Sequence, residues 1–290
     1  MTYVLAIGDY TYSSWSLRGW LLFEAFSIPF KTQLIDFSAA AVADQLGAFR
    51  PARTVPAMKL ADGTVIGDSL AIGEELASRH PEQAYWPADP TARSIGRSLA
   101  AEMHSSFTGL RSYCPMNLRQ AYSDVPVDDG VQDDLKRLEQ LWSWARAETK
   151  PNGPWLIGDY SIADVFFAPV AARIAGYGLQ VGPEAQAYVS AHLAHAPFRR
   201  WRAMGFARGA VLPRYAKPYS VAPWPGPKTL AAEPVTSGPS ENALCPYSGT
   251  DVTHFLQVDG RVFGFCNAFC RDKTIADPLA WDSFRGIYQS

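Results

Sequence analysis

The first 80 residues alternate between strand-like and helix-like patterns of hydrophobic positions. Residues 3–8 form a short apolar run, and residues 17–26 then carry the spacing of an amphipathic helix. Residues 30–37 alternate as a strand does, and the Ala-rich residues 39–49 predict a second helix. Two apolar runs at 55–60 and 64–66 flank Asp62-Gly63, a dipeptide typical of a hairpin turn, and Ser69 begins another helix. We therefore predict an α/β domain over residues 1–82.

From residue 90 the hydrophobic spacing becomes helical. Apolar positions recur with helical period over residues 91–112, 131–149, 162–175 and 183–194. Ser161 is followed three residues later by Asp164, a pattern typical of a capping box at a helix start. The order βαβ and then ββα in residues 1–82 is thioredoxin-like, and residues 90–205 are predicted to form an all-helical domain. The predicted class is thus α/β plus all-α.

The last third of the chain changes composition twice. Residues 206–240 are rich in Pro, Gly, Ala and Ser and predict a mostly extended linker. Residues 241–290 regain aromatic and apolar positions, and a hairpin with an Asp259-Gly260 turn leads to a short helix from Asn267. A unit of this size often needs a metal or another staple. We expect a small zinc-ribbon-like tail here.

Composition and charge narrow the class of partner. The chain has 290 residues, 48% of them hydrophobic, and a net charge of −2. Neither a basic patch for nucleic acid nor an apolar run long enough for a membrane span is found, so we predict no nucleic-acid or membrane partner. Four cysteines do not make a disulfide scaffold in a chain of this length, and no secretory signal is recognisable, so a cytoplasmic protein is expected.

Hydroxyl residues stand at the first predicted strand-to-helix junction. The sequence there is Ser13-Ser14-Trp15-Ser16. Because the first N–H groups of a helix have no partner within the helix, this end attracts anions, and a serine hydroxyl can donate to a bound thiolate. Ser13 and Ser14 can equally serve as helix caps. The junction is therefore a candidate thiolate site.

Two further features follow in the same domain. Val55-Pro56 precedes a strand, where a cis proline can leave the preceding backbone groups available to a peptide. Asp68-Ser69 stands at a helix start, where a hydroxyl and backbone N–H groups can hold a carboxylate.

With these three features in this order, residues 1–205 resemble the glutathione transferase family, nearest to its serine-type zeta class and related bacterial forms. The resemblance implies that Ser13, with Ser14 as runner-up, faces the sulfur of glutathione. It implies that Pro56 is cis and that glutathione is held by Ser16, Val55, Pro56, Asp68 and Ser69. It also implies a homodimer.

The reaction implied is conjugation of the glutathione thiolate to a small-molecule electrophile. Trp15 stands where the zeta class has a cysteine, and with Arg111 and Tyr113 it is a candidate for the electrophile pocket. The alternatives are a glutathione-dependent isomerase or dehalogenase, and a non-catalytic protein that responds to glutathione or metal. His80, His104, His192 and His195 lack metal-like spacing, and we assign them no role.

Three cysteines in the tail have the spacing of a metal site. Cys245, Cys266 and Cys270 read C-x20-C-x3-C around the predicted hairpin, which resembles TRASH and YHS-like treble-clef metal domains. Ser248 fills the place of a fourth cysteine, and His254 is the nearest imidazole. The resemblance implies structural zinc. Free thiols in a small core, or a Cys266–Cys270 redox pair, are the alternatives.

Overall fold

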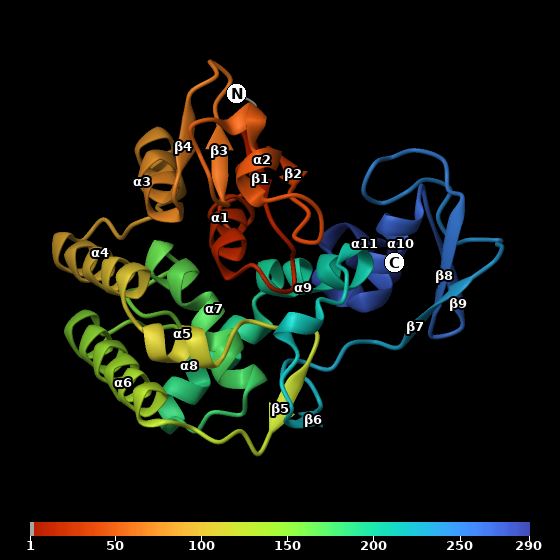
Figure 1. The fold of residues 1–290 in the computed structure, drawn as a ribbon. Helices are drawn as coiled ribbons and strands as arrows, with labels where there is room; N and C mark the ends of the chain where they lie inside the picture. The colour runs from red at the N-terminus through yellow and green to blue at the C-terminus, as the bar shows by residue number, and fades with distance from the viewer. Residues whose placement is uncertain (1–2) are drawn as a thin grey trace. The chain divides into compact units, whose positions relative to one another are not determined.

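The computed structural model describes residues 3–290 (Figure 1). Its first part is a four-stranded sheet in the order β2-β1-β3-β4, in which β1 is parallel to β2 and the other neighbours are antiparallel. The strands are β1 (Tyr3–Ile7), β2 (Phe30–Leu34), β3 (Ala57–Lys59) and β4 (Val65–Gly67). Helices α1 (Ser14–Glu24) and α3 (Ser69–Arg79) follow β1 and β4. The predicted order βαβ-ββα and the thioredoxin-like fold are confirmed.

The helix predicted over residues 39–49 is much shorter than expected. Only α2 (Val42–Gln45) and the single 3-10 turn η1 (Gly47–Phe49) form there. Leu46 and Phe49 are fully buried in a cluster with Ala6 and Ile35 beside the sheet. The segment thus follows the packing of these two side chains rather than the helix propensity of its alanines.

A helical region follows and confirms the all-helical prediction in outline. A short turn η2 (Pro81–Gln83) leads into it, and its helices are α4 (Pro90–Ser105), α5 (Thr108–Tyr113), α6 (Asp129–Thr149), α7 (Ile162–Gly176) and α8 (Pro183–Ala194). The predicted helix 91–112 is broken at Phe107, which is buried and has a φ of 61°. The capping box of Ser161 and Asp164 begins α7, whose residues are nearly all buried.

The region predicted as linker contains regular structure. Strand β5 (Ala121–Ser123), inside the predicted helical domain, pairs with β6 (Ser220–Ala222), and the turn η3 (Pro213–Tyr215) precedes β6. β7 (Ala232–Val235) also lies in that stretch and pairs with β8. Residues that look like a linker are therefore used as edge strands by two different sheets.

The chain forms two compact units whose limits differ from the predicted domains. The first contains Met1–Leu193 and Leu212–Pro225, and the second contains Ala194–Val211 and Gly226–Ser290. Helix α9 (Ala196–Arg208), which the sequence placed in the helical domain, packs in the second unit against α10 (Ala268–Ala276). Arg199 of α9 forms two hydrogen bonds of 2.6 and 2.8 Å with the buried carboxylate of Asp277. A buried ion pair of this kind is invisible to local periodicity.

The second unit has its own small core. Its antiparallel sheet runs β7-β8-β9, with β8 (His254–Val258) and β9 (Arg261–Phe265) forming the predicted hairpin. The turn η4 (Pro278–Ala280) and α11 (Asp282–Tyr288) complete it. Leu256, Phe263, Phe265 and Phe284 are fully buried.

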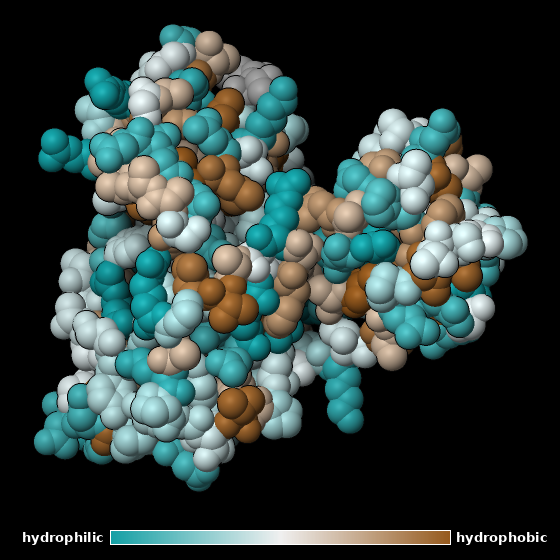
Figure 2. All heavy atoms as spheres, turned by 45° about the vertical axis from the view of Figure 1, so that its right-hand side comes forward, coloured by the Kyte–Doolittle hydropathy of each residue, from teal (hydrophilic) through white to brown (hydrophobic). Residues whose placement is uncertain are grey.

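The surface carries no continuous apolar band on the face that Figure 2 shows, where hydrophobic residues lie in small groups among hydrophilic ones. Large exposed hydrophobic side chains are spread over several elements, including Trp144 on α6 and Val221 on β6. Within residues 3–290, no helix is both long and apolar enough to cross a membrane.

Candidate functional site

The loop between β1 and α1 holds the serines of the candidate thiolate site. Ser13 is the N-cap of α1, and its Oγ accepts a hydrogen bond from the backbone N–H of Ser16 at 3.3 Å. The Ser13 hydroxyl also donates to Ser16 Oγ at 2.8 Å, and the N–H of Gly8 donates to the same oxygen. Ser13 is thus held at the positive end of α1, with its oxygen on the wall of a pocket.

Ser14 and Ser16 have different surroundings. Ser14 is partly exposed in the same pocket, and Arg173 Nη2 donates to its Oγ at 3.3 Å. Ser16 is fully buried and does not line the pocket, so the prediction that it contacts glutathione directly is corrected. Its hydroxyl instead ties Ser13 to Gly8 and fixes the loop.

The Val55–Pro56 peptide bond is cis, as the resemblance implies. Pro56 is buried and packs against α1, since a Cβ built on Gly19 would meet the Pro56 ring at 2.6 Å. Val55 lines the pocket, and within residues 3–290 its backbone makes no hydrogen bond. Its N–H and C=O are therefore available to an extended peptide.

Asp68 and Ser69 stand at the start of α3, and Asp68 contacts His104, to which the sequence analysis assigned no role. Asp68 caps the helix, since its Oδ1 accepts from the N–H groups of Leu70 and Ala71 at 2.7 and 3.3 Å. Its other oxygen lies 3.1 Å from Nε2 of His104 on α4. Ser69 is 1% exposed, and its hydroxyl has no hydrogen-bond partner in the described chain. Because a buried hydroxyl without a partner is costly, this site fits a carboxylate ligand.

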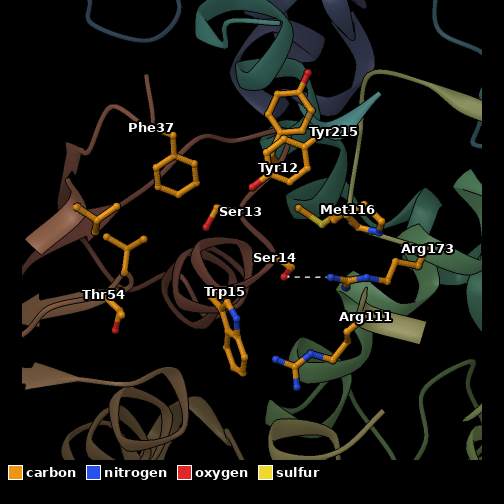
Figure 3. A pocket seen from close by; sticks show the side chains of 13 residues that line it. Tyr12, Ser13, Ser14, Trp15, Phe37, Thr54, Arg111, Met116, Arg173 and Tyr215 are labelled. Carbon is orange, nitrogen blue, oxygen red and sulfur yellow. Dashed lines mark hydrogen bonds between the residues drawn. The ribbon is translucent and has the colours of Figure 1, made fainter. Parts of the chain in front are cut away.

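Ser13, Ser14 and Val55 line one cavity of about 380 Å³ (Figure 3), whereas Pro56, Asp68 and Ser69 do not line it. Its size is that of a small-molecule site. The serines, Thr54 and Val55 come from the thioredoxin-like domain, and Arg111, Met116 and Arg173 come from the helical region. The full lining is Tyr12, Ser13, Ser14, Trp15, Phe37, Val42, Thr54, Val55, Arg111, Pro115, Met116, Arg173 and Tyr215.

The charged groups that line this cavity are all cationic. Among the described lining residues, Arg111 and Arg173 carry the charge, and no carboxylate accompanies them. Burial, together with the charge of Arg111, lowers the pKa of Arg173 to about 10, so it is still protonated at neutral pH. Burial lowers the pKa of Arg111 as well. Two guanidinium groups on one wall favour an anionic ligand.

Trp15 connects this wall to the protein interior. Its ring lies 4.7 Å from the guanidinium carbon of Arg111 and 4.6 Å from that of Arg18, as cation–π pairs do. Arg18 is buried, and its Nε donates to the carbonyl of Phe166 at 3.1 Å, which makes it structural. Trp15 and Arg111 thus line the pocket as predicted.

Tyr113 does not line the pocket, which corrects its assignment. Its hydroxyl donates to the carbonyl of Pro126 at 2.7 Å. The residue lies at the end of α5, two positions after Arg111, and residues two apart on a helix do not share a face. Arg173, Tyr12, Phe37 and Tyr215 line the pocket although the sequence did not indicate them. Their spacing is that of ordinary core positions, so no local signal separates them from the core.

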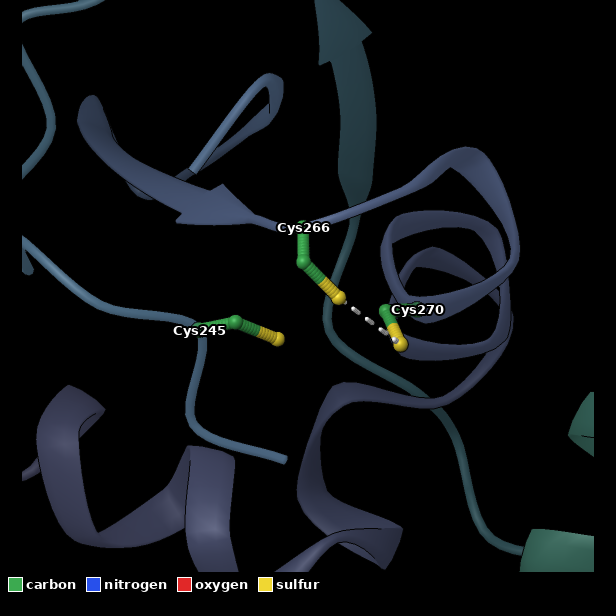
Figure 4. A group of neighbouring side chains, drawn as sticks. All are labelled: Cys245, Cys266 and Cys270. Carbon is green, nitrogen blue, oxygen red and sulfur yellow. Dashed lines mark hydrogen bonds between the residues drawn. The ribbon is translucent and has the colours of Figure 1, made fainter. Parts of the chain in front are cut away.

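The three tail cysteines converge in the second unit (Figure 4). The Sγ atoms of Cys245, Cys266 and Cys270 all lie within 4.8 Å of one another, and those of Cys266 and Cys270 are 3.9 Å apart. Zinc with sulfur ligands at about 2.3 Å in a tetrahedron needs sulfurs about 3.8 Å apart, so the set fits such an ion. His254 is outside this group, since its Nδ1 is paired with the hydroxyl of Thr253 at 2.9 Å. The prediction of His254 as a ligand is corrected.

The chemical environment of Cys245 also suits a thiolate ligand. Burial raises the pKa of this thiol, but N–H groups of Cys266, Tyr247 and Ser248 and the Ser248 hydroxyl outweigh it and lower the pKa to about 7. Gly249 supplies the positive φ of 67° that lets the Cys245–Gly249 turn close.

Comparisons with known proteins relate the first domain to a known family. Residues 12–79 match the family described as "Glutathione S-transferase, N-terminal domain". Maleylacetoacetate isomerase of Rattus norvegicus is 27% identical over 142 residues, which cover 48% of this chain and 62% of that protein. The enzyme of the same name from Pseudomonas aeruginosa is 29% identical over 162 residues, covering 53% of this chain and 73% of its own. The chain spans less than two thirds of some of these relatives, with 55% for the Dictyostelium discoideum isomerase.

Solved structures share the fold. A glutathione transferase homologue from Burkholderia with bound glutathione aligns with a TM-score of 0.52 at 20% identity, covering 70% of this chain and 97% of that one. Maleylacetoacetate isomerase from Anaeromyxobacter dehalogenans, with glutathione in its active site, aligns with a TM-score of 0.50 at 26% identity, covering 69% and 94%. Residues 12–79 therefore match the glutathione S-transferase N-terminal domain and have its thioredoxin-like fold, and the chain is similar to maleylacetoacetate isomerases.

Proposed function

We propose that this protein is a glutathione-dependent isomerase of a conjugated electrophile that carries a carboxylate. One observation carries the proposal: the serine hydroxyls at the start of α1 share a pocket with the guanidinium groups of Arg111 and Arg173. The names of the relatives support isomerisation, and the two cations support an anionic substrate. Conjugation to an electrophile uses the same thiolate and is the second outcome to be tested.

Glutathione is proposed to bind as an extended peptide along the thioredoxin-like domain. The backbone of Val55, beside cis Pro56, pairs with its cysteinyl residue. The unpartnered hydroxyl of Ser69 and the N–H groups at the start of α3 hold its γ-glutamyl carboxylate. Asp68, oriented by His104, faces the ammonium group of the same residue. This arrangement brings the thiol to Ser13.

Ser13 is proposed to stabilise the thiolate. Hydroxyl hydrogens rotate, so Ser16 can donate to Ser13 and leave the Ser13 hydroxyl free to donate to sulfur. The N-terminus of α1 adds partial positive charge, which favours the ionised thiol. Ser14 is the runner-up, since Arg173 polarises its hydroxyl.

The reaction then needs only the thiolate and a place for negative charge. The sulfur adds to one carbon of the double bond, and the π electrons move to the conjugated carbonyl oxygen as an enolate. The former double bond rotates, the carbonyl forms again, and the C–S bond breaks to restore the thiolate. The guanidinium groups of Arg111 and Arg173 hold the substrate carboxylate and stabilise the enolate charge.

A glutathione titration at neutral pH, followed by the ultraviolet absorbance of the thiolate, tests the activating site. We expect a thiolate signal that Ser13→Ala reduces and that the control Ser78→Ala, on α3 outside the pocket, leaves unchanged. Loss of the signal in Ser14→Ala alone would transfer the role to Ser14. Glutathione binding without any thiolate signal would favour the non-catalytic alternative.

Proton NMR of maleylacetoacetate with catalytic glutathione then separates the reactions. Isomerisation converts the cis double bond to trans without consuming glutathione. Conjugation consumes one glutathione for each substrate molecule. Neither change, in protein that binds glutathione as thiolate, would contradict both catalytic proposals for this compound.

We also propose that Cys245, Cys266 and Cys270 bind one structural zinc ion. The convergence of their Sγ atoms within 4.8 Å supports this. The Ser248 hydroxyl or a water molecule would complete four ligands. Elemental analysis of untagged protein should give one zinc per chain, lost in Cys270→Ser and kept in Cys114→Ser, whose thiol is in the core of the first unit. Metal-free protein that also fails to take up added zinc would contradict the site.

A homodimer and a cytoplasmic location stay predictions. Sedimentation of the full chain at several concentrations tests the first.

A further inference from the structure

The segment 212–216, which the sequence presents as linker, forms one wall of the glutathione-site cavity. Tyr215 lines the cavity, and its ring stacks on that of Tyr12 with centroids 4.5 Å apart and planes at 24°. Tyr12 directly precedes Ser13, so the stacked pair stands next to the proposed thiolate site. Figure 3 shows these two rings on a different side of the cavity from Arg111 and Arg173.

Contacts fix this segment at several points of the same compact unit. The N–H of Leu212 donates to the hydroxyl oxygen of Tyr12 at 3.2 Å, in a buried position. Arg214 Nη2 donates to the carbonyl of Phe37, itself a lining residue, at 3.4 Å. The turn η3 places Tyr215 directly after these two contacts.

The chain after the turn is fixed as well. The N–H of Lys217 donates to the hydroxyl of Tyr122 at 3.3 Å, and β6 then pairs with β5. Hydrogen bonds of the residues before and after Tyr215 therefore fix its position. A side chain that recognises a ligand needs such support.

The arginine side and the tyrosine side of the cavity differ in chemistry. Arg111 and Arg173 offer two guanidinium groups, while Tyr12, Tyr215 and Met116 offer ring faces and a thioether. A ligand that fits both must have an anionic end and a flat, polarisable body, because aromatic faces favour stacking on planar groups. A short aliphatic acid would leave the aromatic wall without contact.

We propose that Tyr215 determines second-substrate specificity, selecting an aryl or extended planar conjugated group that carries a carboxylate. This rests on the proposed function, since it assigns the cavity beside Ser13 to the second substrate. It also gives a catalytic-pocket role to a segment beyond the residues that match the glutathione S-transferase domain.

S-substituted glutathiones test this without knowledge of the natural substrate. Calorimetry would compare glutathione, S-methylglutathione, S-benzylglutathione and S-(4-carboxybenzyl)glutathione on the full-length protein. In the unmodified protein we expect the benzyl compound to bind about tenfold more tightly than the methyl compound, with a further gain from the carboxylate. Tyr215→Ala should reduce the benzyl-to-methyl ratio to near one and leave glutathione itself unchanged.

Two variants separate recognition from folding. Tyr215→Phe keeps the ring and should keep the ratio. Tyr219→Ala removes an aromatic ring from the same segment, one that packs against Tyr122 outside the cavity, and should keep it too. The proposal would be overturned by a ratio near one in the unmodified protein, or by an unchanged ratio in Tyr215→Ala. Failure to bind glutathione at all would instead overturn the proposed function.

Discussion

Arg173 offers a prediction in which stability and ligand recognition should separate. Its guanidinium is buried, and burial and the charge of Arg111 lower its pKa from the ordinary guanidinium value to about 10. At 1.36 kcal/mol per pKa unit, holding this charge in the folded state costs about 3 kcal/mol at neutral pH. Nε and Nη1 donate to the carbonyls of Cys114 and Pro169 at 2.9 and 3.1 Å.

Arg173→Met removes both the buried charge and the hydrogen bonds that offset the cost of burying it. Hydrogen bonds from a charged donor contribute about 1.5–3 kcal/mol each, so the two carbonyl contacts roughly offset the burial of the charge. The free energy of unfolding should therefore change by no more than about 3 kcal/mol. A carboxylate that bonds to Arg173 should lose about 1.5–3 kcal/mol, which is a ten- to hundredfold loss of affinity.

Urea unfolding and ligand titration together check this reasoning. The affinity ratio of S-(4-carboxybenzyl)glutathione to S-(4-methylbenzyl)glutathione should collapse in Arg173→Met, while glutathione binds as before. A variant that unfolds at much lower urea but keeps the carboxylate preference would refute it. Arg173 would then be a structural residue, and the anion site would depend on Arg111.

Three further predictions concern the surroundings of the site. Burial raises the pKa of Asp164 to about 6, so this group alone should lower the free energy of unfolding by about 3 kcal/mol as the pH rises from 4 to 7. Asp164→Asn should lose this pH dependence, as measured by urea unfolding. The same pH dependence in the variant and the unmodified protein would contradict the prediction. Gly8→Ala would place a Cβ 2.2 Å from the ring of Phe37 and displace this pocket residue, at about 1–3 kcal/mol of stability and with weaker glutathione binding by calorimetry. Gly47→Ala is the matched control, because nothing lies within 4 Å of a Cβ at that position. Equal effects of Gly8→Ala and Gly47→Ala would contradict the predicted clash with Phe37. Chelation should lower the melting temperature of the full chain in calorimetry, because an ion that binds only the folded chain stabilises it. An unchanged melting curve would contradict the zinc proposal.

Local patterns predicted the thioredoxin-like domain because its elements follow short-range rules. The apolar run of β1, the Asp62-Gly63 turn and the caps at Ser13 and Asp68 each depend on neighbours within a few residues. The cysteine spacing of the tail predicted a convergence that the structure confirms, since a hairpin and one helical turn have fixed geometry.

Packing between distant segments decided the rest. Residues 39–49 form little helix, because Leu46 and Phe49 are buried against the sheet. Helix α9 belongs to the second unit, where Arg199 pairs with Asp277. Tyr113 lies two residues after Arg111 on α5, and positions two apart on a helix do not share a face, so only Arg111 lines the site.

The chain by itself thus determined where a thiolate can be held, because a helix N-terminus with serines is a local device. Only the tertiary structure decided what else faces that thiolate. Arg173 and Tyr215 lie 159 and 201 residues beyond Ser14, and their place in the cavity results from the burial of α7 and from the hydrogen bonds of segment 212–216. Long-range contacts of this kind leave no period in the sequence.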